Sequence, residues 1–282
     1  MPIFELTLDD GERLVGESHG SGPGLVVVQQ SLSTVEDYRA LAMHLGQHLT
    51  VHLFERRGHG GSSPPLSPPS LKQEAAELGR LLDATGAEMV LAHSSGALVA
   101  LELARTRRLD ALALYDPGVS VDGSLPTEWV PDFVAAVRAG AQGLARALVS
   151  AGLNTPPLMA RLPLPLRRLA AGVFLRTRRG RMFRQQLDAG ASELLLVVAH
   201  DRPASTYDDL LVPLWIAIGA ESPRHYRTTS ERLRDAVPGT SLTVIPGAGR
   251  RALTLASPQL TEPLLDYLTH ASGDPDPRVQ RP

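Results

Sequence analysis

The stretch MVLAHSSGALVALELA, residues 89–104, passes from a strand pattern into a helical pattern across a pair of serines. Its first residues form an apolar run that is typical of a buried parallel strand. A helix is expected from residue 95 to residue 106. Ser94 lies at the junction, and the small residues Ala92 and Gly96 on either side permit a sharp turn. The stretch therefore predicts a strand–turn–helix unit that presents a serine hydroxyl on a strained turn.

Strand and helix patterns alternate on both sides of this unit. Residues 3–8 and 12–17 flank Asp9-Asp10-Gly11 and predict an opening hairpin, because Asp-Gly favours tight antiparallel turns. Apolar runs predict further strands at residues 24–30, 49–54, 89–92, 111–115, 214–218 and 241–245. Periodic patterns predict helices at residues 35–45, 71–85, 95–106, 223–236 and 258–270. The alternation predicts an α/β fold with a mostly parallel sheet flanked by helices.

This alternation is interrupted in the middle of the chain. Between residues 119 and 205 the patterns are helical, which predicts a helical cap inserted into an α/β core made of residues 1–118 and 206–271. The tail, residues 272–282 (SGDPDPRVQRP), is polar and rich in proline and is expected to be disordered.

Composition narrows the class of protein. The chain has 282 residues, of which 43% are hydrophobic and 21% charged, and its net charge of −2 argues against a nucleic-acid partner. The absence of cysteine excludes disulfides and thiol nucleophiles, and no cluster of metal-ligating residues stands out, so neither metal nor cofactor is expected. No apolar run approaches the roughly 20 residues of a membrane helix, and the first ten residues lack a signal-peptide pattern. A cytoplasmic location is therefore expected.

The serine turn resembles the nucleophile elbow of the α/β-hydrolase superfamily in its capped, single-domain form, with Ala92 in place of the usual first glycine. The resemblance covers nearly all of residues 3–270, because four further landmarks follow in the family's order. They are residues 54–62 (FERRGHGGS), 114–117 (LYDP), 218–223 (IGAESP) and 246–249 (PGAG). The resemblance implies the α/β-hydrolase fold, with Ser94 at the nucleophile position and Glu221 at the strand end that presents the catalytic acid.

The chain departs from the family pattern at the catalytic base. Where the family has histidine, this chain has Arg250, and a permanently charged guanidinium cannot take the proton of a serine hydroxyl. The series Ser94, Glu221 and Arg250 is therefore not a hydrolytic triad. Arg250 is expected instead to form a hydrogen-bonded ion pair with Glu221.

A second departure concerns the loop that normally carries His-Gly and helps to form the oxyanion hole. Here it reads Gln29-Gln30-Ser31-Leu32. Backbone N–H groups of Ser31 and Ser95 are the candidate donors, and Gln30 can add a side-chain group to the pocket. Further candidate substrate-binding residues are Asp116, which ends a core strand, and Trp129 in the cap. Asp116 can equally cap the turn that enters the cap.

Other residues leave alternatives open. His200 and His225 are candidates for a substitute base, whereas His93 is expected beneath the serine turn and His59 within an ordered loop. Arginines gather in the cap, either as a solvated face or for an anionic or polyphenolic substrate. They are Arg167, Arg168, Arg176, Arg178, Arg179, Arg181 and Arg184.

The leading functional expectation is a non-hydrolytic enzyme that catalyses a cyclisation, carbon–carbon bond-forming or lyase-type step in bacterial secondary metabolism. One alternative is a serine esterase or C–C hydrolase that uses Ser94 with a substitute base, and another is a non-catalytic small-molecule-binding protein. The expected partner is a hydrophobic or polyphenolic small molecule, with no nucleic acid and no membrane. A monomer or a homodimer is expected.

Overall fold

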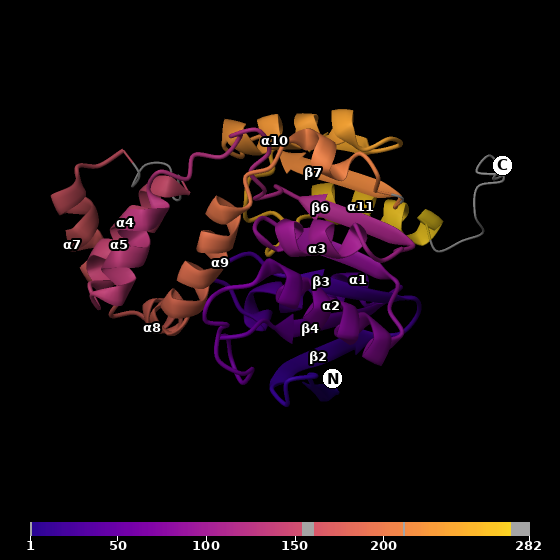
Figure 1. Ribbon diagram of the computed structural model, residues 1–282, viewed down its shortest axis with the longest axis horizontal. Coiled ribbons are helices and arrows are strands. Elements are labelled where there is room, and N and C mark those ends of the chain that lie inside the picture. The colour runs from indigo at the N-terminus through magenta and orange to yellow at the C-terminus, as the bar shows by residue number, and fades with distance from the viewer. Residues whose placement is uncertain (1, 154–160, 211, 272–282) are drawn as a thin grey trace.

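Eight strands form one sheet in the computed structural model of the chain, which describes residues 2–153, 161–210 and 212–271 (Figure 1). The tail at residues 272–282, for which disorder is expected, lies outside the described residues. In spatial order the strands are β1 (Ile3–Thr7), β2 (Arg13–Gly20), β4 (Thr50–Glu55), β3 (Gly24–Val28), β5 (Met89–His93), β6 (Ala111–Tyr115), β7 (Leu214–Gly219) and β8 (Ser241–Ile245).

Only the first two strands break the parallel pattern. β1 and β2 form the expected hairpin, in which Gly11 adopts a positive φ of 81°, and β2 then pairs with β4 in antiparallel fashion. All remaining neighbours are parallel, and the registers include Val27 opposite Leu91. The prediction of a mostly parallel α/β sheet is confirmed, with β2 longer than its sequence pattern indicated.

Helices cover both faces of the sheet, as the strand patterns require. On one face lie α2 (Leu71–Thr85), α3 (Gly96–Ala104) and α10 (Arg224–Ala236), packed on alternate strand residues such as Val26 and Val90. On the other face lie α1 (Arg39–Leu45), preceded by a 3-10 turn at Val35–Tyr38, and α11 (Pro258–Ala271). These pack on the intervening residues, including Val27 and Leu91. Continuous apolar strands are thus buried on both sides.

Five described helices lie between β6 and β7, and we call them the cap helices. They are α4 (Val130–Arg138), α5 (Gln142–Gly152), α7 (Leu164–Phe174), α8 (Arg178–Gln185) and α9 (Leu187–Ala199). A separate apolar cluster that includes Phe133, Val149 and Leu194 joins α4, α5 and α9, and Phe183 of α8 packs against it. Figure 1 shows α4, α5, α7 and α8 standing to one side of the sheet, with α9 between them and the core. A short 3-10 turn at Ala204–Tyr207 leads back to β7.

A buried ion pair fixes α9 to the core. Glu193 Oε1 of α9 lies 3.0 Å from Arg56 Nη1 and 3.0 Å from His59 Nε2. Arg56 and His59 both belong to the loop after β4. All three side chains are less than 10% exposed. His59 therefore has the ordering role expected from the sequence. The cap helices consequently face the carboxyl ends of the parallel strands, the edge at which open α/β sheets bind ligands.

Candidate active site

Ser94 occupies the strained turn between β5 and α3. Its φ is +50°, a left-handed conformation that is unfavourable for a residue other than glycine. Three backbone hydrogen bonds hold it there: Ser94 N–H donates to Tyr115 O, and Ser94 O accepts from the N–H groups of Ala97 and Gly118. A Cβ atom on Gly118 would lie only 2.9 Å from Ser94 Oγ, so this glycine leaves room for the hydroxyl. The predicted strand–turn–helix unit is present, with Ser94 only 6% exposed.

A small cavity of about 40 Å³ lies beside Ser94, between the core and the cap helices. Ser95 and Trp129 line it, as the sequence predicts, and His225 and Tyr226 enter it from the first turn of α10. Its other walls are mainly apolar and include Leu125, Pro126, Val130, Leu153, Leu194 and Val197. A ligand that binds beside Ser94 therefore moves from water into mainly apolar surroundings.

The loop after β3 is partly engaged with the elbow. Ser31 N–H donates to Ser95 Oγ at 2.7 Å, so this candidate oxyanion donor already has an acceptor. Within the described chain the backbone N–H of Ser95 has no acceptor, and it remains free to bind a ligand oxygen. Gln29 turns inward and donates to Phe54 O, while Gln30 extends toward the loop that follows β8.

Asp116 lies at the end of β6 and is fully buried. Its Oδ1 accepts from Gly219 N–H at 3.1 Å and its Oδ2 from Ser222 Oγ at 2.5 Å, so it ties β6 to the end of β7. Burial raises the pKa of Asp116 to about 6, against the opposing effects of these hydrogen bonds and of the Arg250 charge. Asp116 lines none of the three cavities described here, and its carboxylate binds the end of β7 rather than the turn that enters the cap.

Arg250 follows β8 and points toward the loop after β3. Its Nη2 donates to Gln30 Oε1 at 3.1 Å, and its guanidinium carbon lies 5.4 Å from the ring centroid of Tyr226. The buried Nε has no partner within the described chain. A guanidinium held over an aromatic ring is stabilised by a cation–π interaction.

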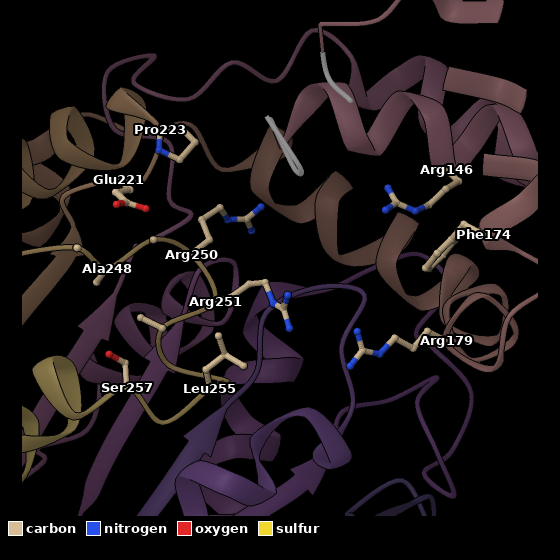
Figure 2. A pocket seen from close by; sticks show the side chains of 13 residues that line it. Arg146, Phe174, Arg179, Glu221, Pro223, Ala248, Arg250, Arg251, Leu255 and Ser257 are labelled. Carbon is tan, nitrogen blue, oxygen red and sulfur yellow. The ribbon is translucent and has the colours of Figure 1, made fainter. Parts of the chain in front are cut away.

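The expected ion pair between Glu221 and Arg250 is not formed. Figure 2 shows the Arg250 guanidinium directed away from the Glu221 carboxylate. Glu221 N–H donates to Ala248 O, and the Glu221 side chain remains exposed to water. Among the described residues no carboxylate pairs with Arg250. The pairing prediction was wrong: the exposed carboxylate keeps its hydration, whereas the guanidinium is bound by Gln30 and lies over the Tyr226 ring.

Tyr226 lies beside both Ser94 and Arg250, because it lines the Ser94 cavity and carries the Arg250 guanidinium over its ring. It is buried, and burial raises the pKa of its phenol, while the Arg250 charge and the neighbouring Ser94 side chain act in the opposite direction. The phenol is therefore a neutral group close to both the serine and the guanidinium. No sequence pattern singles out Tyr226; the only signal is its place in the first turn of the helix that follows β7.

Three histidines occupy different positions around the serine. His225 lines the cavity of Ser94, and burial together with the Arg250 charge lowers its pKa to about 4. His200 lies outside this cavity, and its ring nitrogen contacts Leu196 O at 2.8 Å. His93 is buried beneath the turn, where it hydrogen-bonds to Tyr38 and burial lowers its pKa to about 3. No described histidine forms a hydrogen bond with Ser94.

Two larger, open cavities share Arg250 with each other, and one of them borders the Ser94 cavity. One, of about 720 Å³, lies between the cap helices and residues 247–257 and includes Glu221 and Arg250. The second, of about 310 Å³, includes Gln30, Ser31 and Arg250 and shares Leu153 with the cavity of Ser94. The predicted site residues thus gather at one edge of the sheet but in neighbouring cavities. The described part of the chain offers no group of three metal-ligating side chains and no helix able to cross a membrane.

Comparisons with known proteins agree with this architecture. A model of the "Alpha/beta hydrolase family" matches residues 18–263. A curated relative, 2-heptyl-3-hydroxy-4-quinolone dioxygenase AqdC2 from Rhodococcus erythropolis, is 30% identical over 156 residues, or 51% of this chain and 56% of the relative. The match therefore spans about half the length of that protein.

Solved structures resemble the chain over nearly its whole length. An alpha/beta hydrolase from Sphaerobacter thermophilus superposes with a TM-score of 0.76 at 22% identity, covering 94% of this chain and 100% of that one. An enol-lactonase from Burkholderia xenovorans superposes with a TM-score of 0.70 at 19% identity, covering 94% and 99%. At these identities the likeness establishes the fold alone.

Proposed function

The chain belongs to the alpha/beta hydrolase family, and from that premise we propose that it is a non-hydrolytic enzyme in which Arg250 takes the place of the catalytic histidine. One observation carries the proposal. The side chain that follows β8 and reaches Tyr226 beside Ser94 is a guanidinium, held by Gln30 and stacked on that ring.

The groups around Ser94 do not activate it for acyl transfer. A serine hydroxyl needs a base to remove its proton during attack, and an arginine stays protonated. Tyr226 is a neutral phenol with a raised pKa, so it is not a base near neutral pH. Asp116 already accepts from Gly219 and Ser222. An acyl-enzyme on Ser94 is therefore not part of the proposed mechanism.

The same groups suit a negatively charged oxygen on the substrate. Ser94 Oγ–H and the free N–H of Ser95 are hydrogen-bond donors in an apolar cavity. The positively charged Arg250 lies over the Tyr226 ring, which lines the same cavity. Preorganised donors of this kind stabilise an enolate more strongly than water does. The proposed reaction is a cyclisation, carbon–carbon bond-forming or lyase-type step on a hydrophobic or polyphenolic molecule of bacterial secondary metabolism. The substrate enters as an acidic enol or phenol, whose proton passes to water as the oxyanion binds.

The relative named as a 2-heptyl-3-hydroxy-4-quinolone dioxygenase supports this class of substrate. A ring hydroxyl beside a carbonyl is acidic, and release of its proton to water leaves an oxyanion of the kind that Arg250 favours. Oxygenation of such a ring is therefore a second candidate reaction, in which dioxygen is the co-substrate. The specific support for this second reaction is the match to about half of that relative.

A serine esterase remains the competing function, because His225 lines the cavity of Ser94. Its pKa of about 4 leaves the imidazole neutral near pH 7, as a base must be, but weakly basic. This low basicity is why we favour the non-hydrolytic function.

Two measurements test the proposal. With a panel of p-nitrophenyl esters and a serine-directed phosphonate, the protein and its Ser94→Ala variant should give the same background hydrolysis and no labelling. Turnover that Ser94→Ala abolishes would overturn the proposal. In a spectroscopic pH titration, bound 2-heptyl-3-hydroxy-4-quinolone should ionise at lower pH with the unmodified protein than with Arg250→Gln, and oxygen uptake reports the second candidate reaction.

The titration also has a matched control. Arg108→Gln removes an exposed arginine in the connection before β6, at the opposite edge of the sheet, and should leave ligand ionisation unchanged. Equal ionisation in all three proteins would count against a role of Arg250 in stabilising an oxyanion.

A further inference from the structure

Four arginines converge on the two larger cavities from three separate elements. Arg146 comes from α5, Arg179 from α8, and Arg250 and Arg251 from the loop after β8, and all four line both cavities. Figure 2 shows the guanidinium groups of Arg146, Arg179 and Arg251 directed into the space between the cap helices and this loop. We call this space the arginine cleft.

The charge of the arginine cleft is not neutralised by the described residues. None of its four arginines pairs with a described carboxylate, whereas ten arginines elsewhere in the described chain do. The acidic residues along the cleft are Glu221, which is exposed and unpaired, and Asp37, which accepts from Thr34 N–H at 3.0 Å. The cleft therefore has an excess of positive charge.

Arg146 is the most constrained of the four. Its guanidinium carbon lies 4.7 Å from the ring centroid of Phe174 and 5.4 Å from that of Phe183, and its Nη1 donates to Ser150. The buried Nε has no partner within the described chain. Burying a cation without a counter-charge costs free energy, and burial lowers the pKa of Arg146. The two rings hold this cation in place ahead of binding, which favours a negatively charged ligand.

We propose that the arginine cleft binds the acidic group of an aromatic small molecule whose reactive part extends past Arg250 to Ser94. Guanidinium groups match the planar geometry of a carboxylate or sulfonate. Phe174, Phe183 and Leu255 give the cleft apolar surface for a ring. A volume of about 720 Å³ lies within the usual range of small-molecule sites. The inference specifies the substrate class of the proposed function, and it rests on that function only for the placement of the reactive part.

The test compares two probes that differ in charge but share their apolar surface. By isothermal titration calorimetry, 2-naphthoate should bind about tenfold more tightly than 2-naphthamide, the factor expected from one charge-assisted interaction. Arg146→Gln and the double variant Arg179→Gln/Arg251→Gln should each remove this preference. Arg108→Gln should keep it. Equal binding of the two probes, or a preference that survives in both cleft variants, would overturn the proposal.

Two controls keep the result decisive. Arg179 and Arg251 are exposed, so their double variant reports on the cleft even where Arg146→Gln lowers stability. Ser94→Ala should retain the preference for naphthoate, because the acidic group does not reach the serine. Failure of the proposed function would instead appear as Ser94-dependent ester hydrolysis, which leaves the naphthoate comparison unaffected.

Discussion

Glu193 provides a direct test of how the cap helices are attached. We expect Glu193→Ala to destabilise the protein, because it leaves Arg56 and His59 buried without the carboxylate that both contact at 3.0 Å. Removing one member of a buried ion pair costs roughly 3–5 kcal/mol. Arg56 retains a second carboxylate, Glu74, so the lower end of about 3 kcal/mol applies here. At about 2–4 °C per kcal/mol, Tm should fall by roughly 6–12 °C.

The measurement is thermal and urea unfolding followed by circular dichroism, with Glu262→Ala as the matched control. Glu262 is an exposed glutamate on α11. Burial alone would raise the pKa of Glu193, but the charges of Arg56 and His59 outweigh it and hold that pKa below its usual value. The stabilisation is therefore complete above the unfolded-state pKa and is lost as pH falls through the lower folded-state pKa. A loss of stability no larger than that of Glu262→Ala would refute this reasoning.

Three further outcomes are expected. Gly118→Ala should disturb the serine turn, because the added Cβ would lie 2.8 Å from Ser94 C and 2.9 Å from Ser94 Oγ. Loss of 2-heptyl-3-hydroxy-4-quinolone binding in calorimetry, with secondary structure retained, checks this. The folded-state pKa of Asp116, about 6, exceeds the ordinary 3.8. The contribution of Asp116 to the free energy of unfolding is therefore largest below the ordinary pKa and declines as pH rises from about 4 to 6. The free energy of unfolding of the unmodified protein in urea should therefore fall by about 2 kcal/mol relative to that of Asp116→Asn over that interval, and parallel pH profiles would contradict it. Arg250→His should restore at most traces of p-nitrophenyl acetate hydrolysis, since Asp116 is already engaged and Glu221 is exposed; competent esterase activity would show that these departures matter little.

The core was predictable because its signals are local. The strands at residues 111–115 and 241–245 and the helix at residues 71–85 have the ends that the sequence predicts. For the helix these ends have physical causes: the Ser70 side chain accepts from Gln73 N–H, and Gly86 leaves the helix with a φ of +68°. Apolar runs and end signals of this kind require no knowledge of distant residues.

The site was less predictable because its side chains depend on contacts between distant segments. Arg250 and Gln30 are 220 residues apart, and nothing in either loop specifies their hydrogen bond. Arg146 reads as a single surface charge on an apolar helix, and its burial arises only when α7 and α8 bring Phe174 and Phe183 against it. Tyr226 lies in a helix whose sequence, RHYRTTSERLRDA, is largely polar.

The position of the cap helices in the chain also affects how the protein can change. β6 and β7 are direct neighbours, paired from Leu112 opposite Leu214 onward, so residues 116–213 form a single long excursion between two adjacent strands. The entropy cost of closing such an excursion rises only with the logarithm of its length, about 0.6 kcal/mol for each doubling. The stability of the sheet therefore depends only weakly on the length of this connection. Insertions and deletions within the cap helices can therefore reshape the entrance to the cavity while β5, Ser94 and α3 keep their places in the core.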